Sequence, residues 1–195
     1  MNKEGKITLC ILALIIMGHI IYTIDSQRRH LIGIISNSQS KLDSALNDIH
    51  KLNIHYDSLL NIVDSLPLGS PLDTLEISSD YGWRRSPFKI GWQMHAGTDY
   101  MAAWQDTVYA TGNGIVSKSK WIGGYGRCII IDHAWGYESK YAHLYRYFVK
   151  SGDTVSKGQA IGRAGNSGAV TGPHLHYEVR RNGKTTNPET FMLDK

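Results

Sequence analysis

The stretch "GPHLHYEVRRNG", from Gly172 to Gly183, places two histidines on either side of a single leucine. Side chains two residues apart on a β-strand point to the same face, so His174 and His176 face one way and Leu175 faces the other. A buried imidazole needs a partner for each ring nitrogen, which makes two such close neighbours costly in an ordinary core. The stretch therefore predicts a strand with one face in the core and one face at a site.

Segments on the N-terminal side of this stretch predict further strands. "RCIIIDH" (127–133) is typical of a buried strand, and "ESKYAHLYRYFV" (138–149) alternates between apolar and polar residues. "DTVYATGNGIVSKSKW" (106–121) alternates around a Gly-Asn-Gly turn and predicts a hairpin. Because no long helical period follows Pro71 and the connections are short, we predict an all-β domain of antiparallel sheets over residues 78–195.

The N-terminal part has a different pattern. "ITLCILALIIMGHIIYTI" (7–24) is 18 residues long, carries no Asp, Glu, Lys or Arg, and lies at the lower length limit for a membrane-spanning helix. No small-residue cleavage site follows closely, which disfavours a cleaved signal peptide. Residues 1–30 therefore predict a cytoplasmic tail with a retained single-pass membrane anchor.

Residues 31–66 repeat apolar side chains at alternating steps of four and three, which is typical of a coiled-coil seam. The seam positions are Leu31, Ile35, Ser38, Leu42, Ala45, Ile49, Leu52, Tyr56, Leu59, Val63 and Leu66. The pattern predicts an amphipathic helix that either forms a homodimer or lies singly on the following domain. Pro67, Gly69 and Pro71 then end the helix, so we predict a linker over residues 67–77.

Composition limits the functional class. Twenty glycines and an excess of Tyr (11) over Phe (3) favour a turn-rich β domain. Residues 78–195 carry a net charge of +6, but their Lys and Arg residues are scattered, which argues against a nucleic-acid partner. The two cysteines, Cys10 and Cys128, lie far apart and predict no disulfide framework.

Two further segments bring candidate metal ligands. In "QMHAGTDY", His95 and Asp99 are four residues apart and share a face in an extended chain, and "YAHLY" adds His143. By the same alternation, Tyr141 shares a face with His143. Hydrolytic zinc sites take three nitrogen or oxygen ligands and leave a fourth position for water, which two histidines and a carboxylate would satisfy. The residues alone leave open whether these are ligands or hydrogen-bonded structural histidines.

"HAGTD", "YAHL" and "GPHLHYEV" together resemble the LytM/lysostaphin-type zinc endopeptidases, the M23 peptidase family, over roughly residues 78–188. The resemblance implies antiparallel sheets in a barrel-sandwich-hybrid-like fold. It implies zinc ligands at His95, Asp99 and His176, and a catalytic pair at His143 and His174. Arg84, in "YGWR", matches a family arginine near the groove. We list Arg84 and Tyr141 as candidate substrate-binding residues, with a structural role as the alternative for each.

The implied function is a membrane-anchored zinc endopeptidase that hydrolyses peptide cross-links of peptidoglycan during cell-wall remodelling or growth. The catalytic domain would lie in the periplasm or extracytoplasmic space, with the anchor in the cytoplasmic (inner) membrane. The alternative is a catalytically silent wall-binding or division-scaffold protein that activates other hydrolases. The bond that is cut, and which of His143 and His174 acts as the base, stay open.

Overall fold

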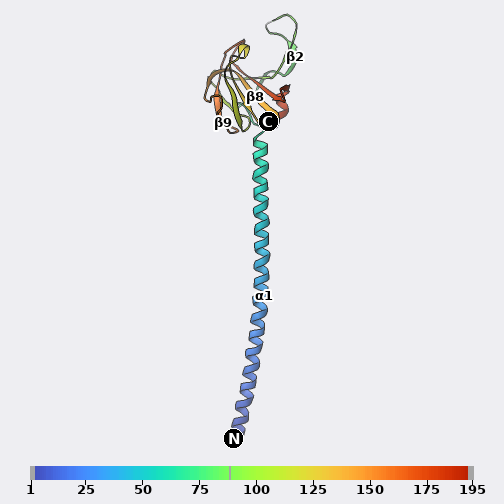
Figure 1. Ribbon diagram of the computed structural model, residues 1–195, viewed down its shortest axis with the longest axis vertical. Coiled ribbons are helices and arrows are strands. Elements are labelled where there is room, and N and C mark those ends of the chain that lie inside the picture. The colour runs from blue at the N-terminus through green and yellow to red at the C-terminus, as the bar shows by residue number, and fades with distance from the viewer. Residues whose placement is uncertain (1–2, 88, 193–195) are drawn as a thin grey trace. The chain divides into compact units, whose positions relative to one another are not determined.

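A computed structural model describes residues 3–87 and 89–192 (Figure 1). Residues 1–2, 88 and 193–195, which fall within the predicted tail and the predicted β domain, lie outside the described part of the chain. The chain divides into two compact units, residues 1–57 and residues 58–195, and each is described by itself.

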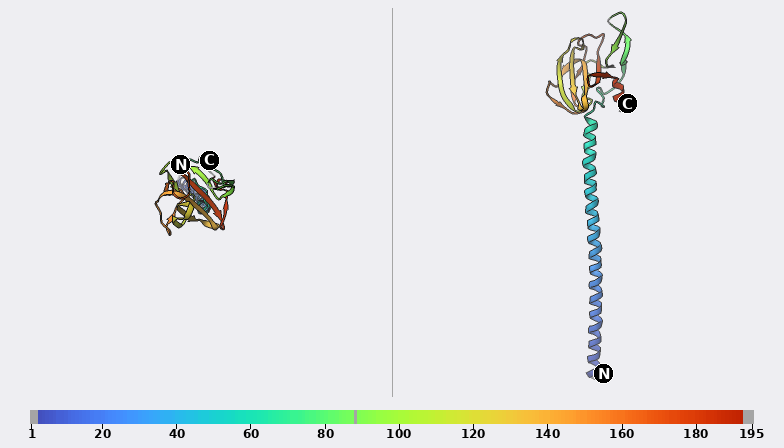
Figure 2. Two further views of the ribbon diagram at one scale, coloured as in Figure 1. Left: turned by 90° about the horizontal axis from the view of Figure 1, so that it is seen from above. Right: turned by 45° about the vertical axis from the view of Figure 1, so that its right-hand side comes forward.

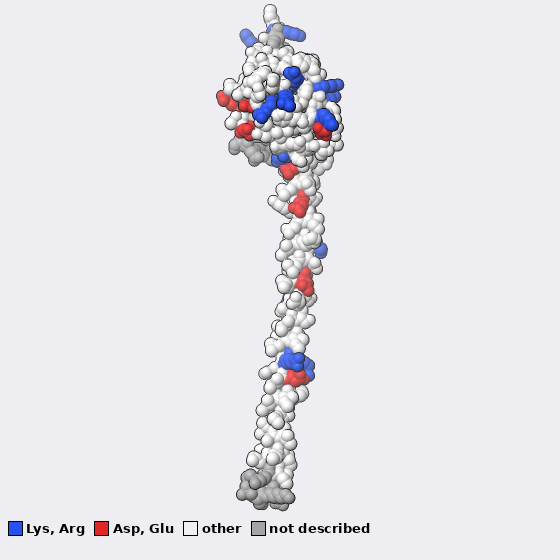
Figure 3. Space-filling view, turned by 90° about the vertical axis from the view of Figure 1, so that its left-hand side faces the viewer, with Lys and Arg blue, Asp and Glu red and all other residues white. Residues whose placement is uncertain are grey.

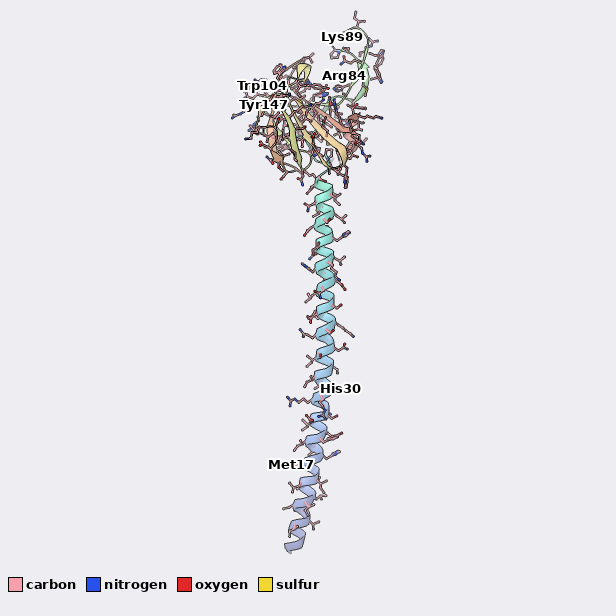
Figure 4. All side chains as sticks on the ribbon, in the orientation of Figure 1. Met17, His30, Arg84, Lys89, Trp104 and Tyr147 are labelled. Carbon is pink, nitrogen blue, oxygen red and sulfur yellow. The ribbon has the colours of Figure 1, made fainter. Side chains whose placement is uncertain are left out.

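The first unit is helical, and its helix α1 (Lys3–Asp64) extends into the start of the second unit. The predicted anchor and the predicted amphipathic helix therefore form one uninterrupted helix. By length and composition, α1 could cross a membrane. On the face shown in Figure 3, no charged side chain interrupts the apolar stretch of α1 before a first group of basic and acidic side chains. Met17 and His30 project outward from the helix (Figure 4).

Apolar seam side chains of α1 are exposed in the single chain. Leu31, Ile35 and Leu42 have exposed fractions of 58%, 64% and 54%. Exposed apolar side chains at this spacing are what a helical partner would cover, but the structure contains one chain, so the coiled coil stays a prediction.

The predicted linker is part of the second unit and packs into it. The Gly69 backbone N–H donates to the Thr111 carbonyl at 2.7 Å, and Leu72 is buried in the core with an exposed fraction of 3%. A side chain at position 69 would place its Cβ 2.9 Å from that carbonyl, so only glycine allows the approach. The last predicted linker residue, Ile77, is already the first residue of a strand.

Twelve strands and three short 3₁₀ turns follow in the described residues, and the sheets are antiparallel throughout. The strands are β1 (Ile77–Ser79), β2 (Gly82–Arg85), β3 (Trp92–His95), β4 (Thr98–Met101), β5 (Thr107–Tyr109), β6 (Gly114–Trp121), β7 (Arg127–Asp132), β8 (Tyr137–Tyr147), β9 (Thr154–Val155), β10 (Ala160–Ala164), β11 (His174–Arg181) and β12 (Lys184–Thr186). The 3₁₀ turns are Gly123–Tyr125, Ala134–Gly136 and Pro188–Phe191. This confirms the predicted antiparallel β domain.

Ten strands form one sheet with the order β1-β4-β11-β8-β7-β6-β9, to which β10, β5 and β12 attach. Strands β2 and β3 form a separate hairpin that projects from the main sheet (Figures 1 and 2). In the main sheet, β11 lies between β4 and β8. The strands that carry Asp99, His143 and the two histidines of β11 therefore lie side by side.

The two faces of β11 differ as its alternation predicts. Leu175, Tyr177 and Val179 are fully buried in the main hydrophobic core, together with Tyr141 and Leu144 of β8. The opposite face carries His176, and across from it on β4 and β8 lie its register partners Asp99 and Ala142.

The predicted hairpin over residues 106–121 is wrong. Strand β5 pairs with β10, whereas β6 pairs with β7 and β9. A tight hairpin turn of the Asn-Gly type needs positive φ at its central residues, and neither Gly112 nor Gly114 has it. These glycines instead permit close packing, because a Cβ would lie 2.3 Å from the Leu66 carbonyl oxygen at position 112 and 2.4 Å from that of Asp132 at position 114.

Candidate metal centre

Three side chains from three strands converge on one point beneath the projecting hairpin. His95 ends β3, Asp99 lies in β4 and His176 lies in β11. His95 Nε2 and His176 Nδ1 are 3.1 Å apart, and they lie 3.1 Å and 2.7 Å from Asp99 Oδ1. All three residues are buried, with exposed fractions between 5% and 8%.

A glycine makes this convergence possible. Gly97 lies between His95 and Asp99, and a Cβ there would sit 2.3 Å from the Tyr177 carbonyl oxygen and 2.9 Å from Glu178 Cγ. The segment that links β3 to β4 can therefore lie directly against β11 only because position 97 has no side chain.

The outer nitrogen of each imidazole has an acceptor of its own. His95 Nδ1 lies 2.7 Å from the Asp80 carbonyl oxygen, and His176 Nε2 lies 3.1 Å from Glu178 Oε1. An acceptor at one ring nitrogen fixes the proton there, so the other nitrogen presents its lone pair. Both lone pairs then point to the centre shared with Asp99.

The electrostatics of this centre follow from its burial and its contacts. Burial alone would raise the pKa of Asp99, but contacts with the His176 and His95 imidazoles outweigh burial and hold it well below its ordinary value. Burial alone would lower the pKa of His176, yet Asp99 and Glu178 beside it raise the pKa above its ordinary value. The centre therefore keeps a carboxylate charge that attracts positive charge between the side chains.

Glu178 is a buried carboxylate behind His176 that the sequence-based prediction missed. It accepts from His176 Nε2, from the Tyr125 hydroxyl at 2.6 Å, from Lys140 Nζ at 2.9 Å and from Arg180 at 2.8 Å. Burial would raise the pKa of Glu178, but the His176 contact and the Lys140 charge lower it to about 2. Glu178 therefore stays charged at neutral pH.

A second pair of imidazoles lies beside the first centre. The rings of His143 and His174 have centroids 4.8 Å apart, and His143 lies 5.8 Å from the ring of His176. His143 Nδ1 lies 2.8 Å from the Ser167 carbonyl oxygen, and His174 Nδ1 lies 2.9 Å from that of Gly172. Burial lowers the pKa of His143 to about 4, so this imidazole is neutral at physiological pH.

Tyr141 does not join this site, so the predicted shared face of Tyr141 and His143 is wrong. Strand β8 has one extra residue between Tyr141 and Leu144 relative to β7, and His143 has a left-handed φ of 60°. This β-bulge turns Tyr141 into the core while His143 faces the groove. The Tyr141 hydroxyl bonds with Thr111 at 2.9 Å and has no exposed surface for a substrate.

Arg84 of β2 does reach the site. Its Nη2 lies 3.3 Å from Asp99 Oδ2, and about a third of its side chain is exposed. Figure 4 shows Arg84 on the projecting hairpin, which forms one wall of a groove over the two histidine clusters. The groove is lined by Arg84, Pro87, Gln93, Met94, His95, Ala96, Asp99, Gly124, Tyr125, His143, Ala169, Val170, Thr171, His174 and His176.

The structure therefore brings together His95, Asp99, His143, His174, His176 and Arg84, and it places Tyr141 elsewhere. A sequence signal existed for Glu178, because the alternation that joins His174 and His176 continues to position 178. Asp80, Gly172 and Ser167 contribute backbone carbonyls, which any residue type provides, and so the sequence held no signal for them.

The donor set fits a divalent transition metal. One ligand atom from each of His95, Asp99 and His176 lies within 4.8 Å of the other two, and all three residues are buried. Two imidazole nitrogens and one carboxylate oxygen, with a groove on the remaining side, match the ligand types and the open fourth position of hydrolytic zinc sites. Because the thiol of Cys128 lies in a separate apolar cluster, this is not a thiolate site of the structural type.

Comparisons with known proteins identify the family of this domain. Residues 93–188 match the model of "Peptidase family M23". The chain is 41% identical over 140 residues to the peptidoglycan DD-endopeptidase ShyC of Vibrio cholerae, which covers 71% of this chain and 32% of ShyC. The chain thus spans about a third of the length of that relative.

Two solved structures share the fold of the β domain. A zinc-containing peptidase from Vibrio cholerae has a TM-score of 0.58 at 34% identity, covering 60% of this chain and 37% of that one. The catalytic domain of the antimicrobial peptidase lysostaphin from Staphylococcus simulans has a TM-score of 0.54 at 32% identity, covering 60% of this chain and 91% of that domain. The chain therefore belongs to peptidase family M23, the family that the sequence motifs resemble.

Proposed function

We propose that this protein is a zinc endopeptidase that hydrolyses peptide cross-links in peptidoglycan. One observation carries the proposal: the buried set His95, Asp99 and His176 opens onto a groove into which a second histidine pair also faces. The named activity of ShyC, a peptidoglycan DD-endopeptidase, supports the substrate class. A catalytically silent scaffold is less well supported, because all five positions of the family pattern are filled.

His95 Nε2, an Asp99 oxygen and His176 Nδ1 would hold the zinc ion. When bound, zinc would polarise a water molecule and the scissile carbonyl. The Asp80 backbone carbonyl accepts from His95 Nδ1, and the Glu178 carboxylate accepts from His176 Nε2. These bonds hold both imidazoles with the other ring nitrogen facing the ion.

His143 and His174 would carry the proton transfers. Each donates its Nδ1–H to a backbone carbonyl, which leaves Nε2 of each ring as the atom that can exchange a proton in the groove. One imidazole would take a proton from the attacking water at Nε2. The other would steady the developing oxyanion, or protonate the leaving amine, only in the form that carries a proton at Nε2 as well. The depressed pKa of His143 favours the base role for this residue.

Arg84 would bind substrate at the rim of the groove. Its guanidinium lies beside Asp99, and about a third of its side chain is exposed. Five N–H donors in a fixed plane suit a carboxylate or a peptide carbonyl of a cell-wall stem peptide.

The N-terminal helix would act as a single-pass anchor in the cytoplasmic membrane, with the β domain on the periplasmic or extracytoplasmic side. Support comes from the apolar stretch of α1, which is long enough to span a bilayer, and from the substrate itself, which lies outside the cytoplasm. The exposed apolar seam of α1 supports a homodimer formed through this helix.

Incubation of the purified, zinc-loaded protein with intact sacculi tests the function. Mass spectrometry of the released fragments should show cleaved cross-links and identify the bond. The matched control is His174→Ala, which should retain zinc and release no fragments. A wild-type protein that binds zinc but leaves sacculi intact, or a His174→Ala variant that cleaves equally well, would contradict the proposal and favour the scaffold alternative.

A further inference from the structure

Glu178 is a fully buried carboxylate directly behind the proposed metal ligand His176. It has no exposed surface, and its strand partner Lys140, with an exposed fraction of 4%, is buried as well. Burying two charges is costly unless each is paired and hydrogen-bonded. Apolar side chains would fill the same space without this cost. The buried charge pair therefore indicates a role other than packing.

The carboxylate is saturated with donors on both oxygens. Oε1 lies 3.1 Å from His176 Nε2 and 2.6 Å from the Tyr125 hydroxyl. Oε2 lies 2.9 Å from Lys140 Nζ and 2.8 Å from Arg180. A carboxylate offers about four acceptor positions, so Glu178 has little freedom to rotate or shift.

We propose that Glu178 is a positioning residue that fixes the tautomer and the direction of His176, and that Lys140 and Tyr125 serve to hold Glu178 in place. The inference rests on the proposed function, in which His176 Nδ1 is a zinc ligand. Glu178 itself faces the far nitrogen of the ring and does not approach the shared centre.

His176 Nε2 can donate a hydrogen bond to position 178 only if the side chain there presents an acceptor. With a carboxylate there, the proton stays on His176 Nε2, and Nδ1 keeps its lone pair toward Asp99 and His95. A glutamine could keep its oxygen toward His176 only by turning its NH₂ group toward the cations of Lys140 and Arg180. The opposite rotamer would point NH₂ at Nε2 and force the proton onto Nδ1, where zinc must bind.

Tyr125 links this network to the groove. Its side chain lines the groove, its ring lies 5.5 Å from the ring of His176, and Lys140 Nζ lies 4.0 Å from its centroid. Tyr125 therefore holds Glu178 from the groove side, and the buried Lys140 contacts both Glu178 and the Tyr125 ring.

The test measures the zinc affinity of the full-length protein in detergent by competition with a chromogenic chelator. Glu178→Gln should weaken zinc binding by about 10- to 100-fold, the usual cost of removing an outer partner of a metal ligand. With cobalt in place of zinc, the visible spectrum of the Glu178→Gln variant should also differ from that of the wild type, because this spectrum reports the geometry of the ligands. Tyr125→Phe, which removes one donor to Glu178 and leaves the charge pair intact, should show a smaller loss.

Glu138→Gln is the matched control. Glu138 lies opposite Arg180 in the neighbouring strand, with 3.8 Å between the charged atoms, and loses the same charge without touching His176. Its zinc affinity should stay within about threefold of wild type, since a partly exposed pair at this distance contributes little. Equal losses in both variants, or unchanged affinity and cobalt spectrum in Glu178→Gln, would overturn the inference.

A second variant covers a failure of Glu178→Gln to fold. Lys140→Met combined with Glu178→Gln removes the unpaired buried cation together with the carboxylate, and it should fold while showing the same loss of zinc affinity. Wild-type affinity in this folded double variant would refute the positioning role. A wild-type protein that binds zinc tightly but cleaves no sacculi would contradict the proposed function and leave this inference intact.

Discussion

The two histidine clusters of this site are built differently. In the set of His95, Asp99 and His176, ring nitrogens and a carboxylate oxygen point at each other, and both imidazoles are oriented from behind. His143 and His174 also hold Nδ1 against a backbone carbonyl, but Nε2 of His174 comes no nearer than 3.7 Å to Asp99 Oδ1, outside hydrogen-bond distance. The first arrangement is suited to holding a cation, and the second is suited to exchanging protons with something in the groove.

The largest expected effect separates the two clusters by metal content. His176→Ala removes one of three ligands, so we expect loss of bound zinc and a fall in cleavage of at least about 1,000-fold, since metal catalysis is worth several kcal/mol. Elemental analysis of the purified variant and digestion of sacculi measure both. Full zinc occupancy in this variant would show that the ligand set has been wrongly assigned.

The next effect should appear in the second cluster alone. His143→Ala and His174→Ala should each keep one zinc per chain and lose cleavage by about 100- to 10,000-fold, the usual range for a general acid or base. The same two measurements apply. If either variant lost zinc to the same degree as His176→Ala, the proposed division into a metal-binding cluster and a proton-transfer cluster would be wrong.

Acid should weaken the fold through His143. Its pKa is about 4 in the folded chain against an ordinary 6.5, so the unfolded chain takes up the proton first. Stability from this residue is therefore complete above about pH 6.5 and is lost as the pH falls toward 4, by about 2–3 kcal/mol. Urea unfolding of the chelator-treated protein at pH 7.5, 5.5 and 4.5 measures the loss.

His143→Asn is the control for this pH dependence. Asparagine does not titrate in this range and tolerates the left-handed backbone conformation at position 143. Its stability should fall less between pH 7.5 and 4.5 than that of the wild type. An identical fall in both proteins would mean that other groups cause the acid sensitivity.

The smallest effect tests the residue that the structure moved from the site to the core. Tyr141→Phe removes the hydroxyl that accepts from the Thr111 N–H, and it should cost about 1–3 kcal/mol of unfolding free energy. Cleavage per folded molecule should not change. A large loss of cleavage at unchanged stability would return Tyr141 to the substrate-binding residues.

Alternation along strands predicted much of this molecule. It placed Leu175 in the core and joined His174 with His176, because β11 runs without a bulge through these residues. The antiparallel β domain followed from short connections between alternating segments. The grouping of His95, Asp99, His143, His174 and His176 was predicted from a family resemblance, and the structure brings these side chains within reach of one another.

Alternation failed where backbone geometry overrides it. The Gly-Asn-Gly segment suggests a hairpin turn, but its glycines are needed for contacts with residues far away in the chain. Tyr141 was assigned to the wrong face because a one-residue bulge leaves no signature in the amino-acid types around it. Alternation from His174 and His176 could have predicted the position of Glu178. It could not have predicted the carbonyls of Asp80 and Ser167, because every residue type has a backbone carbonyl.

The bulge in β8 also has a consequence for how this strand can change. Tyr141 and Leu144 both pack in the core, while Ala142 and His143 both lie on the other side. No strand with a strict period of two can satisfy these four positions at once. The residues of β8 before and after the bulge therefore follow two alternation patterns, which are offset by one residue. Deleting Ala142 would leave Tyr141, His143 and Leu144 in strict alternation, so a strand without the bulge could keep both core residues and still turn the histidine to the opposite face.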